Sequence, residues 1–429
     1  DKIDPDFNIG EDGWLSVPDP PYPNAMNIIF QYFYPKAEDI VQQQRDYIQD
    51  YITSAENTLS GYYFSNPHLG YNKYLNTGSF VDHMLLREVS KEVDSYRYST
   101  YFFKEKDSDG GKLHAGPPWD FNLGYSNVDY WYPGIDYTGW VYTLVEPVDW
   151  SIMFWWARLN DDVYFRNLAK TRWQQMRQVD WSNSQLEYAI DSIVGYIYQA
   201  QQRNYERWPI LGEYVWPNYN WQGNDYEDEV AFFETWLYNR LDWIDNNLEG
   251  NILDPSAELS GTLPAVVITL SDDYFSREIL KNKYFVLNNV PPGISIDTVI
   301  FENAAQATIH LEGTITYPLE FSVTMDKKIL NSFNDLTSGL FSAAVGNASH
   351  AVEDPVMFAT AGALHLKCNQ PELLGGFMDV FNLSGQRISR NAIEQVKLNT
   401  IQSNLIPGIY FCSYQYDGKV QTRRIILTK

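Results

Sequence analysis

The sequence predicts an α+β protein in which a β-hairpin and several helices form the N-terminal region and two all-β sandwich domains follow. Helical periodicity is confined to the N-terminal part, whereas from about Leu253 the composition changes to Thr, Val, Ile and Ser in short alternating runs. At 429 residues the chain is too long for one ordinary hydrophobic core. We therefore expect three domains, which cover residues 1–250, 251–345 and 346–429.

Helices are predicted on both sides of the hairpin. The first spans residues 36–59, because apolar residues recur at spacings of four or its multiples before Gly61 ends the run. Ser79 begins a second helix over residues 80–93. The remaining predicted helices cover residues 161–178, 184–208 and 224–250.

The segment between Asp94 and Asp120 is predicted to form the β-hairpin. Residues 96–104 are β-branched and aromatic, as expected of a strand, and residues 107–111 supply the Asp and Gly of a turn. Residues 112–115 return as the second strand. Because an antiparallel hairpin brings its open ends together, we expect the two carboxylates at one site, where one acts as a base beside a metal ligand.

The returning strand leads into the run Pro118-Trp119-Asp120-Phe121-Asn122, and residues 154–173 and 203–219 add two further aromatic-rich segments. Together these features resemble the CotH family, the spore-coat-protein-H-like atypical kinases, whose hallmark is a Pro-Trp-Asp-aromatic-Asp/Asn run. The resemblance covers roughly residues 1–250. It implies that the N-terminal region is a kinase-like C-lobe.

The resemblance also implies roles for three residues. Asp94 is the candidate catalytic base, and Asp120 and Asn122 are the candidate ligands of Mg²⁺ or Mn²⁺ bound with ATP. The implied reaction transfers a phosphoryl group to Ser or Thr of a surface or extracellular protein. From spacing alone, an acid at the position of Asp94 is more often a cap or turn residue, and Asn122 is equally able to cap the loop that follows it.

Two departures from the kinase pattern stand in the sequence. A kinase catalytic loop carries a metal-binding Asn five positions after its Asp, and here that position is Ser99. No Gly-rich phosphate loop and no strand Lys paired with a Glu precede Asp94. The family's N-terminal lobe would precede residue 1, so we expect a chain truncated within the kinase-like domain, inactive as it stands, whose ATP-binding residues are unknown.

Two non-catalytic interpretations remain open. The protein is either a kinase-shaped surface scaffold or an adhesin associated with carbohydrate. The adhesin interpretation depends on the aromatic residues between Trp119 and Trp156, which are able to stack on sugars, although large aromatic side chains are usually buried. We also expect Lys91 and Arg97 to pair with Glu88 or Glu92.

The second region is predicted to be an immunoglobulin-like β-sandwich. Alternating runs at residues 265–270, 298–303 and 307–317 indicate its strands. Residues 284–314 are similar to Ig-like repeats of large secreted bacterial proteins, which usually act as spacers or adhesive units.

The last region resembles the C-terminal sorting domain of type IX secretion. The matching features are the turn at residues 382–385, the Pro-Gly-Ile-Tyr run at 407–410 and a hairpin that contains Gly418. The family's usual Pro-Asn-Pro opening is missing, and only residues 368–371 come near it. The resemblance implies a secreted or cell-surface protein of a Gram-negative bacterium, with the type IX machinery as a partner.

The net charge and composition argue against some classes of binding partner and against a membrane span. The formal net charge of −24 argues against nucleic acid or an anionic membrane as partner, and no window has the ~20 apolar residues of a membrane span. The chain begins at Asp1 without Met, which suggests a cut. The two cysteines, Cys368 and Cys412, either pair with each other or are both buried thiols.

Overall fold

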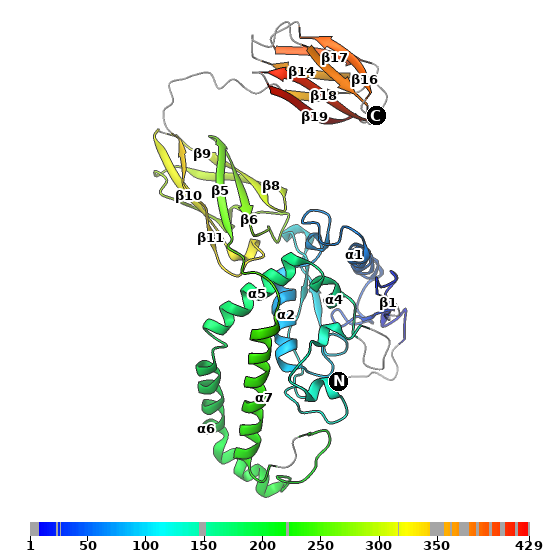
Figure 1. The fold of residues 1–429 in the computed structure, drawn as a ribbon, viewed down its shortest axis with the longest axis vertical. Helices are drawn as coiled ribbons and strands as arrows, with labels where there is room; N and C mark the ends of the chain where they lie inside the picture. Colours follow the sequence, from blue (N-terminus) through cyan, green and yellow to red (C-terminus); the bar gives the residue numbers. More distant parts are fainter. Residues whose placement is uncertain are drawn as a thin grey trace. The chain divides into compact units, whose positions relative to one another are not determined.

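The structure is a computed structural model. It describes residues 8–22, 25, 27–145, 152–219, 223–315, 317–343, 356–360, 363–368, 377–382, 386–393, 397–403, 408–416 and 419–427. Residues 1–343 form one compact unit and residues 344–429 form a second. Helices dominate the N-terminal part of the first unit and strands the rest (Figure 1), in agreement with the predicted α+β class.

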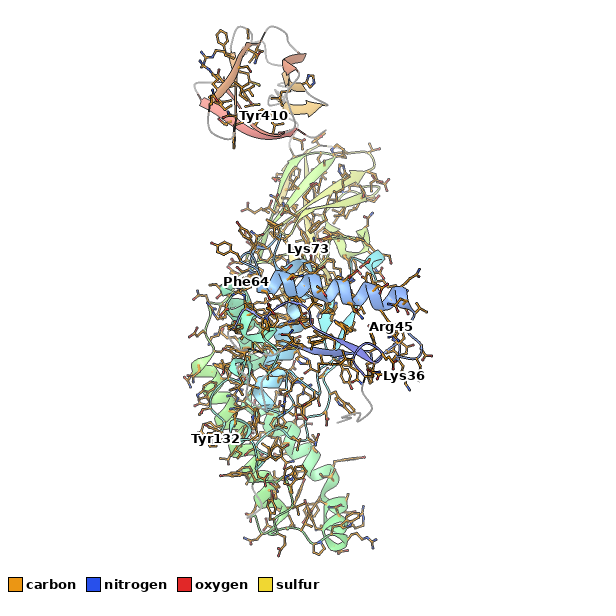
Figure 2. All side chains as sticks on the ribbon, turned by 90° about the vertical axis from the view of Figure 1, so that its right-hand side faces the viewer. Lys36, Arg45, Phe64, Lys73, Tyr132 and Tyr410 are labelled. Atoms are coloured by element: carbon orange, nitrogen blue, oxygen red, sulfur yellow. The ribbon has the colours of Figure 1, made fainter. Side chains whose placement is uncertain are left out.

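The chain begins with a short hairpin and a long helix. Strands β1 (Gly13–Leu15) and β2 (Ile29–Gln31) pair antiparallel, and helix α1 (Gln42–Ser60) follows. Arg45 projects from α1 toward this hairpin (Figure 2), where it donates to the carbonyl of Glu11 at 2.8 Å. The helix begins later than predicted because its first turn forms at Val41, whose N–H is capped by the side chain of residue 44 at 3.2 Å.

Helix α2 (Thr77–Ser90) lies about three residues earlier than predicted. Asn76 caps its start, since the side chain accepts from the N–H of Ser79 at 3.0 Å. The helix ends at Lys91, which adopts the left-handed conformation with φ 45°. Residues 93–98, which include Asp94, then form turns.

The predicted hairpin is present but short. Strand β3 (Phe102–Lys104) pairs antiparallel with β4 (Leu113–Ala115). The prediction of a strand from residue 96 was wrong, because Tyr96 has φ +66° in a turn and its ring is fully buried 4.7 Å from Trp156. Burial of this ring outweighs the β-propensity of the surrounding residues.

Four further helices complete the helical part. They are α4 (Trp155–Asn160), α5 (Val163–Gln178), α6 (Asn183–Arg207) and α7 (Tyr226–Asn247), after the single turn α3 (Tyr132–Ile135). The core beneath them is aromatic: the rings of Phe80 and Trp156 lie 5.3 Å apart and those of Phe80 and Trp155 lie 6.3 Å apart. Helix α6 lies beside α7 (Figure 1), with Tyr205 and Tyr226 in ring contact at 6.3 Å.

Two antiparallel sheets follow within the same unit and share one hydrophobic core. The first has the order β5-β6-β9-β8, and in the second β10 pairs with β7, β11 and β12. The strands are β5 (Ser256–Thr262), β6 (Ala265–Ser271), β7 (Phe285–Asn288), β8 (Ser295–Asn303), β9 (Gln306–Glu312), β10 (Leu319–Met325), β11 (Leu336–Thr337) and β12 (Phe341–Ala343). Membership of the Ig-like class stays a prediction.

The second unit is all β. Its sheets have the orders β13-β14-β17 and β16-β15-β18-β19. The strands are β13 (Val356–Thr360), β14 (Ala363–Cys368), β15 (Phe377–Phe381), β16 (Arg387–Ala392), β17 (Lys397–Ser403), β18 (Gly408–Tyr416) and β19 (Lys419–Leu427). Cys412 is a free, buried thiol. The side chain of Cys368 and the hairpin residue Gly418 lie outside the described residues.

Candidate functional site

The buried guanidinium of Arg87, on α2, connects the two ends of the hairpin. On one side its Nη1 lies 3.6 Å from Glu92 Oε2. On the other, Nη2 donates to the carbonyl of Trp119 at 3.0 Å; the same nitrogen also donates to the carbonyl of Ser99, which lies on the entering side. The guanidinium carbon lies 4.5 Å from the ring centroid of Phe121. One side chain therefore holds the segment that enters the hairpin against the segment that leaves it.

Asp94 lies on the entering side and is only 6% exposed. Its Oδ1 is 3.2 Å from Arg97 Nη2, and its N–H donates to Glu92 Oε2 at 3.0 Å. Burial raises the pKa of Asp94, the Arg97 charge opposes this shift, and the charge of Asp120 adds to it. The structure thus brings Asp94 and Asp120 within electrostatic reach of each other.

Asp120 lies on the leaving side and is half-buried. Its backbone has φ +62°, a left-handed conformation that costs most residues about 1 kcal/mol and that Asp tolerates better than most. The hydroxyl of Ser99 donates to Asp120 Oδ2 at 3.2 Å. The residue that stands at the kinase Asn position therefore contacts the candidate metal ligand.

Asn122 lines a hollow of about 280 Å³ between the segment after Asp120 and helix α7. Its carbonyl accepts from Asn127 Nδ2 at 2.7 Å, and the residue is exposed. Phe232 and Phe233 of α7 give the hollow an apolar wall. The other lining residues are Phe121, Gly124, Tyr125, Ser126, Asn127, Asn218 and Glu229.

Glu92 and Arg87 were missed by the sequence reasoning. Burial raises the pKa of Glu92 to about 7, while its hydrogen bond from the N–H of Asp94 and the charge of Arg87 oppose that shift. A single Arg on a helix and a Glu in the following turn carry no local pattern that distinguishes them from surface charges. The only sequence signal for their role was that Arg87 and Glu92 lie just before and just after the end of α2, close to Asp94 in the chain.

The predicted pairing of Lys91 and Arg97 with Glu88 or Glu92 was wrong. Arg97 pairs with Asp94, and buried Lys91 donates from Nζ to the carbonyls of Asp136, at 2.7 Å, and Thr138. Burial lowers the pKa of Lys91 to about 7. The two acids are occupied elsewhere, because Glu88 pairs with Arg240 and Glu92 with Arg87.

No group of three or more His, Cys, Asp or Glu residues is arranged to hold a metal ion within the part of the chain that the structure describes. Mg²⁺ in phosphoryl-transfer sites is usually held by one or two protein oxygens, with water and phosphate as its other ligands. The carboxylate of Asp120 and the amide oxygen of Asn122 have the right donor chemistry for such a cation. The donor chemistry of these two residues thus fits a divalent cation whose other ligands are water and phosphate.

The aromatic segment from Trp119 onward divides between core and surface. Trp131, Trp155 and Trp156 are buried, in agreement with the expected core role. Tyr130 is 39% exposed and stacks at 5.7 Å on Trp216, which is 64% exposed. Burial raises the pKa of Tyr130, and the charges of Asp94 and Glu92 add to the shift.

Comparison with known proteins identifies the family of the C-terminal domain. A family model described as "Secretion system C-terminal sorting domain" matches residues 360–428. This domain indicates export by type IX secretion, so the protein is secreted or displayed at the cell surface and the type IX machinery is a partner. Among the described residues, none of the helices has the length and apolar character needed to span a bilayer.

No curated protein matches the chain. Solved structures match only weakly. The N-terminal part of the bacterial S-layer protein SbsC has 12% identity and a TM-score of 0.19, over 63% of this chain and 60% of that one. A pullulanase from Anoxybacillus sp. LM18-11 has 11% identity and a TM-score of 0.14, over 39% and 25%. HBP35 of Porphyromonas gingivalis has 12% identity and a TM-score of 0.13, over 50% and 73%. TM-scores this low do not assign the chain to the fold of any of these structures.

The helical part of the chain has a decisive match. A family model described as "CotH kinase protein" covers residues 22–244, more than half of the 429 residues, and includes the hairpin, Arg87 and all three candidate site residues. The chain therefore belongs to the CotH kinase protein family.

Proposed function

We propose that this protein is an exported CotH-type atypical kinase, which transfers the γ-phosphoryl group of ATP to a Ser or Thr hydroxyl of a surface or extracellular protein. The observation that carries the proposal is the bridge made by Arg87, which contacts Glu92 on the Asp94 side and Trp119 beside Asp120. A base and a cation ligand must keep a constant separation during phosphoryl transfer, and a buried bridge between them serves that need.

Asp94 acts as the base in this proposal. It orients the acceptor hydroxyl and takes its proton, and its raised pKa brings the carboxylate closer to the range in which a base works well. Arg97 holds one carboxylate oxygen, Oδ1, at 3.2 Å. The second oxygen, Oδ2, then receives the proton, while Glu92 keeps the backbone of Asp94 in place.

In this proposal Asp120 and Asn122 would hold the divalent cation, which would supply positive charge against the charge that develops on the phosphate oxygens. The hydroxyl of Ser99 orients the Asp120 carboxylate by its hydrogen bond to Oδ2. The apolar wall of the neighbouring hollow, made by residues such as Phe233, excludes water from this side of the site.

A nucleotide titration tests the proposal. The chain is titrated with ATP in the presence of Mg²⁺ or Mn²⁺ and binding is followed by calorimetry, for the native protein and for Asp120→Ala. Loss of a metal ligand is expected to weaken metal-dependent binding by at least the roughly 10–100-fold that loss of a ligand's hydrogen-bonded partner costs. Asp129→Asn, a change in a half-buried acid on the same segment, is the matched control and should bind as the native protein does. Nucleotide binding that is measurable and equal in the native protein and Asp120→Ala would contradict the assignment.

The exposed stack of Tyr130 and Trp216 supports a second candidate function. Stacked, solvent-facing aromatic rings bind the apolar faces of sugars, so a surface adhesin or scaffold that binds polysaccharide uses this pair. Retention on polysaccharide columns tests it. Trp216→Ala should abolish retention, and Trp208→Ala, in which another exposed Trp is removed, should not. The polysaccharide-binding function would be excluded if the native protein is not retained, or if Trp216→Ala and Trp208→Ala are retained equally.

A further inference from the structure

The connection between α7 and the sandwich of residues 256–343 is fastened to the helical part. The N–H of Asn251 donates to Asn167 Oδ1 at 2.8 Å, and the N–H of Leu253 donates to Thr171 Oγ1 at 2.8 Å. Leu253 is buried in the core of the helical part. Gly250 has φ +124°, and a Cβ there would lie 2.7 Å from the carbonyl oxygen of residue 166. The sandwich is therefore not attached by a free linker.

The tip of the hairpin is held by the sandwich. Arg277, in the loop after β6, makes two contacts with the Glu105 carboxylate: Nη1 lies 3.1 Å from Oε2 and Nη2 donates to Oε1 at 3.3 Å. Its Nη1 also donates to the carbonyl of Asp109 at 3.1 Å, and Lys281 forms an ion pair with the Asp109 carboxylate. A Cβ at Gly110 would lie 2.9 Å from the backbone nitrogen of residue 279, so the two backbones are in close contact.

A buried polar contact joins the sandwich to the start of α2. Asn331 Nδ2 donates to Asn72 Oδ1 at 2.8 Å, and the same oxygen accepts from Thr77 Oγ1 at 3.1 Å. Lys112, on the returning side of the hairpin, donates to the carbonyl of Asn72. All four residues are buried, so loss of one partner leaves a desolvated polar group. This contact ties the sandwich to the helix that carries Arg87.

Ring contacts extend the same interface. The rings of Tyr164 on α5 and Tyr274 lie 4.7 Å apart. The guanidinium of Arg172 lies 4.4 Å from the ring of Phe333. Lys73, at the end of the helical part that meets the sandwich (Figure 2), lines a hollow of about 170 Å³ shared with sandwich residues. Ion pairs, buried amides and ring contacts thus act together across one interface.

We propose that the sandwich is a brace for the hairpin, with Arg277 as a positioning residue, and not the spacer that its resemblance implied. The hairpin has only three paired residues on each strand, and isolated two-stranded hairpins are marginally stable at best. Its tip is held by Arg277 and Lys281, and its open ends lead to Asp94 and Asp120. Loosening the tip therefore loosens both acids. The role of the acids rests on the proposed kinase function, whereas the mechanical coupling does not.

Hydrogen–deuterium exchange on the full chain tests the brace. In Arg277→Glu, repulsion from Glu105 should raise amide exchange in residues 102–115 by about tenfold, because fewer contacts oppose local opening. The double variant Arg277→Glu with Glu105→Arg reverses the pair and should restore protection. Lys327→Glu, the same charge reversal at an exposed position of the sandwich, should leave the hairpin unchanged.

Unchanged exchange of the hairpin in Arg277→Glu, or a change of equal size in Lys327→Glu, would overturn the proposal. The ion pair of Lys281 and Asp109 provides a second test if Arg277→Glu fails to fold. Lys281→Glu, at a partly exposed position, should raise exchange at the tip, and Asp109→Lys should restore protection in the double variant. Exchange is measured without nucleotide, so these results are separate from any failure of ATP binding.

Discussion

Glu88 on α2 and Arg240 on α7 form a fully buried ion pair, in which Arg240 Nη2 and Glu88 Oε2 are 3.1 Å apart. The same guanidinium donates to the carbonyls of Tyr137 and Gly139, each at 2.8 Å. Glu88 accepts further hydrogen bonds from Tyr96, Val141 and Tyr142. The pair joins the helix that precedes Asp94 to the helix that lines the hollow beside Asn122.

Loss of this pair is predicted to destabilise the helical part strongly. Arg240→Met keeps most of the side-chain volume but leaves the Glu88 carboxylate buried without its cation, and such a change costs about 3–5 kcal/mol. Denaturant unfolding followed by tryptophan fluorescence measures it. Arg172→Met removes a partly exposed pair with Asp82 in the same helical part and should cost at most about 1 kcal/mol. Similar losses in the two variants would contradict the prediction.

Glu56 is predicted to make stability fall as pH rises. This carboxyl is fully buried on α1, accepts from Ser16 and Trp155, and has a pKa raised by burial from 4.5 to about 7. Between these values the folded state binds more protons than the unfolded state. Its favourable contribution is present below pH 4.5 and is lost as the pH passes 7, a difference of about 3 kcal/mol.

The variant Glu56→Gln isolates this effect, because Gln imitates the protonated acid. We expect it to match the native protein near pH 5 and to exceed it in melting temperature at pH 8. The pH dependence of stability should also flatten in this variant. The pKa of Glu92 is also raised by burial, and Glu92 is unchanged in this variant. We therefore expect the slope of stability against pH to decrease but not to reach zero. Lower stability of Glu56→Gln at pH 8 would refute the assignment.

Arg87→Lys is predicted to separate the two sides of the candidate site while it keeps the charge. An ammonium group lacks the planar fork that reaches Glu92 on one side and Trp119 on the other. Metal-dependent nucleotide affinity should fall by about tenfold or more, because Asp120 loses its fixed place. Arg172→Lys, in an ion pair away from the site, is the control. Equal affinity in Arg87→Lys and native protein would exclude the positioning role.

Cys412 is predicted to react slowly with thiol reagents. It is fully buried in the second unit, and burial raises its pKa to about 11, so little thiolate is present near neutral pH. Alkylation followed by peptide mass mapping should find this position unmodified in the native protein and modified after unfolding. Rapid native labelling, or a disulfide-linked Cys412 peptide, would disagree with the structure.

Much of the architecture was predictable because it depends on local patterns. Recurring apolar residues located α1 and α7, the predicted ranges 161–178 and 184–208 overlap α5 and α6, and alternating residues located strands such as β6 and β9. Turn residues located the hairpin. The Pro118–Asn122 run and the C-terminal motifs identified the two families, which the family models confirm.

The sequence by itself determined the order of elements, the family and the export signal, because periodicity, turn chemistry and short motifs are properties of neighbouring residues. Only the tertiary structure decided that Tyr96 turns inward, that Arg87 bridges Glu92 and Trp119, and that Arg277 meets the hairpin 172 residues before it. Such partners are chosen by burial. A charge excluded from water pairs with whichever opposite charge the packed chain brings beside it, whatever their distance in sequence.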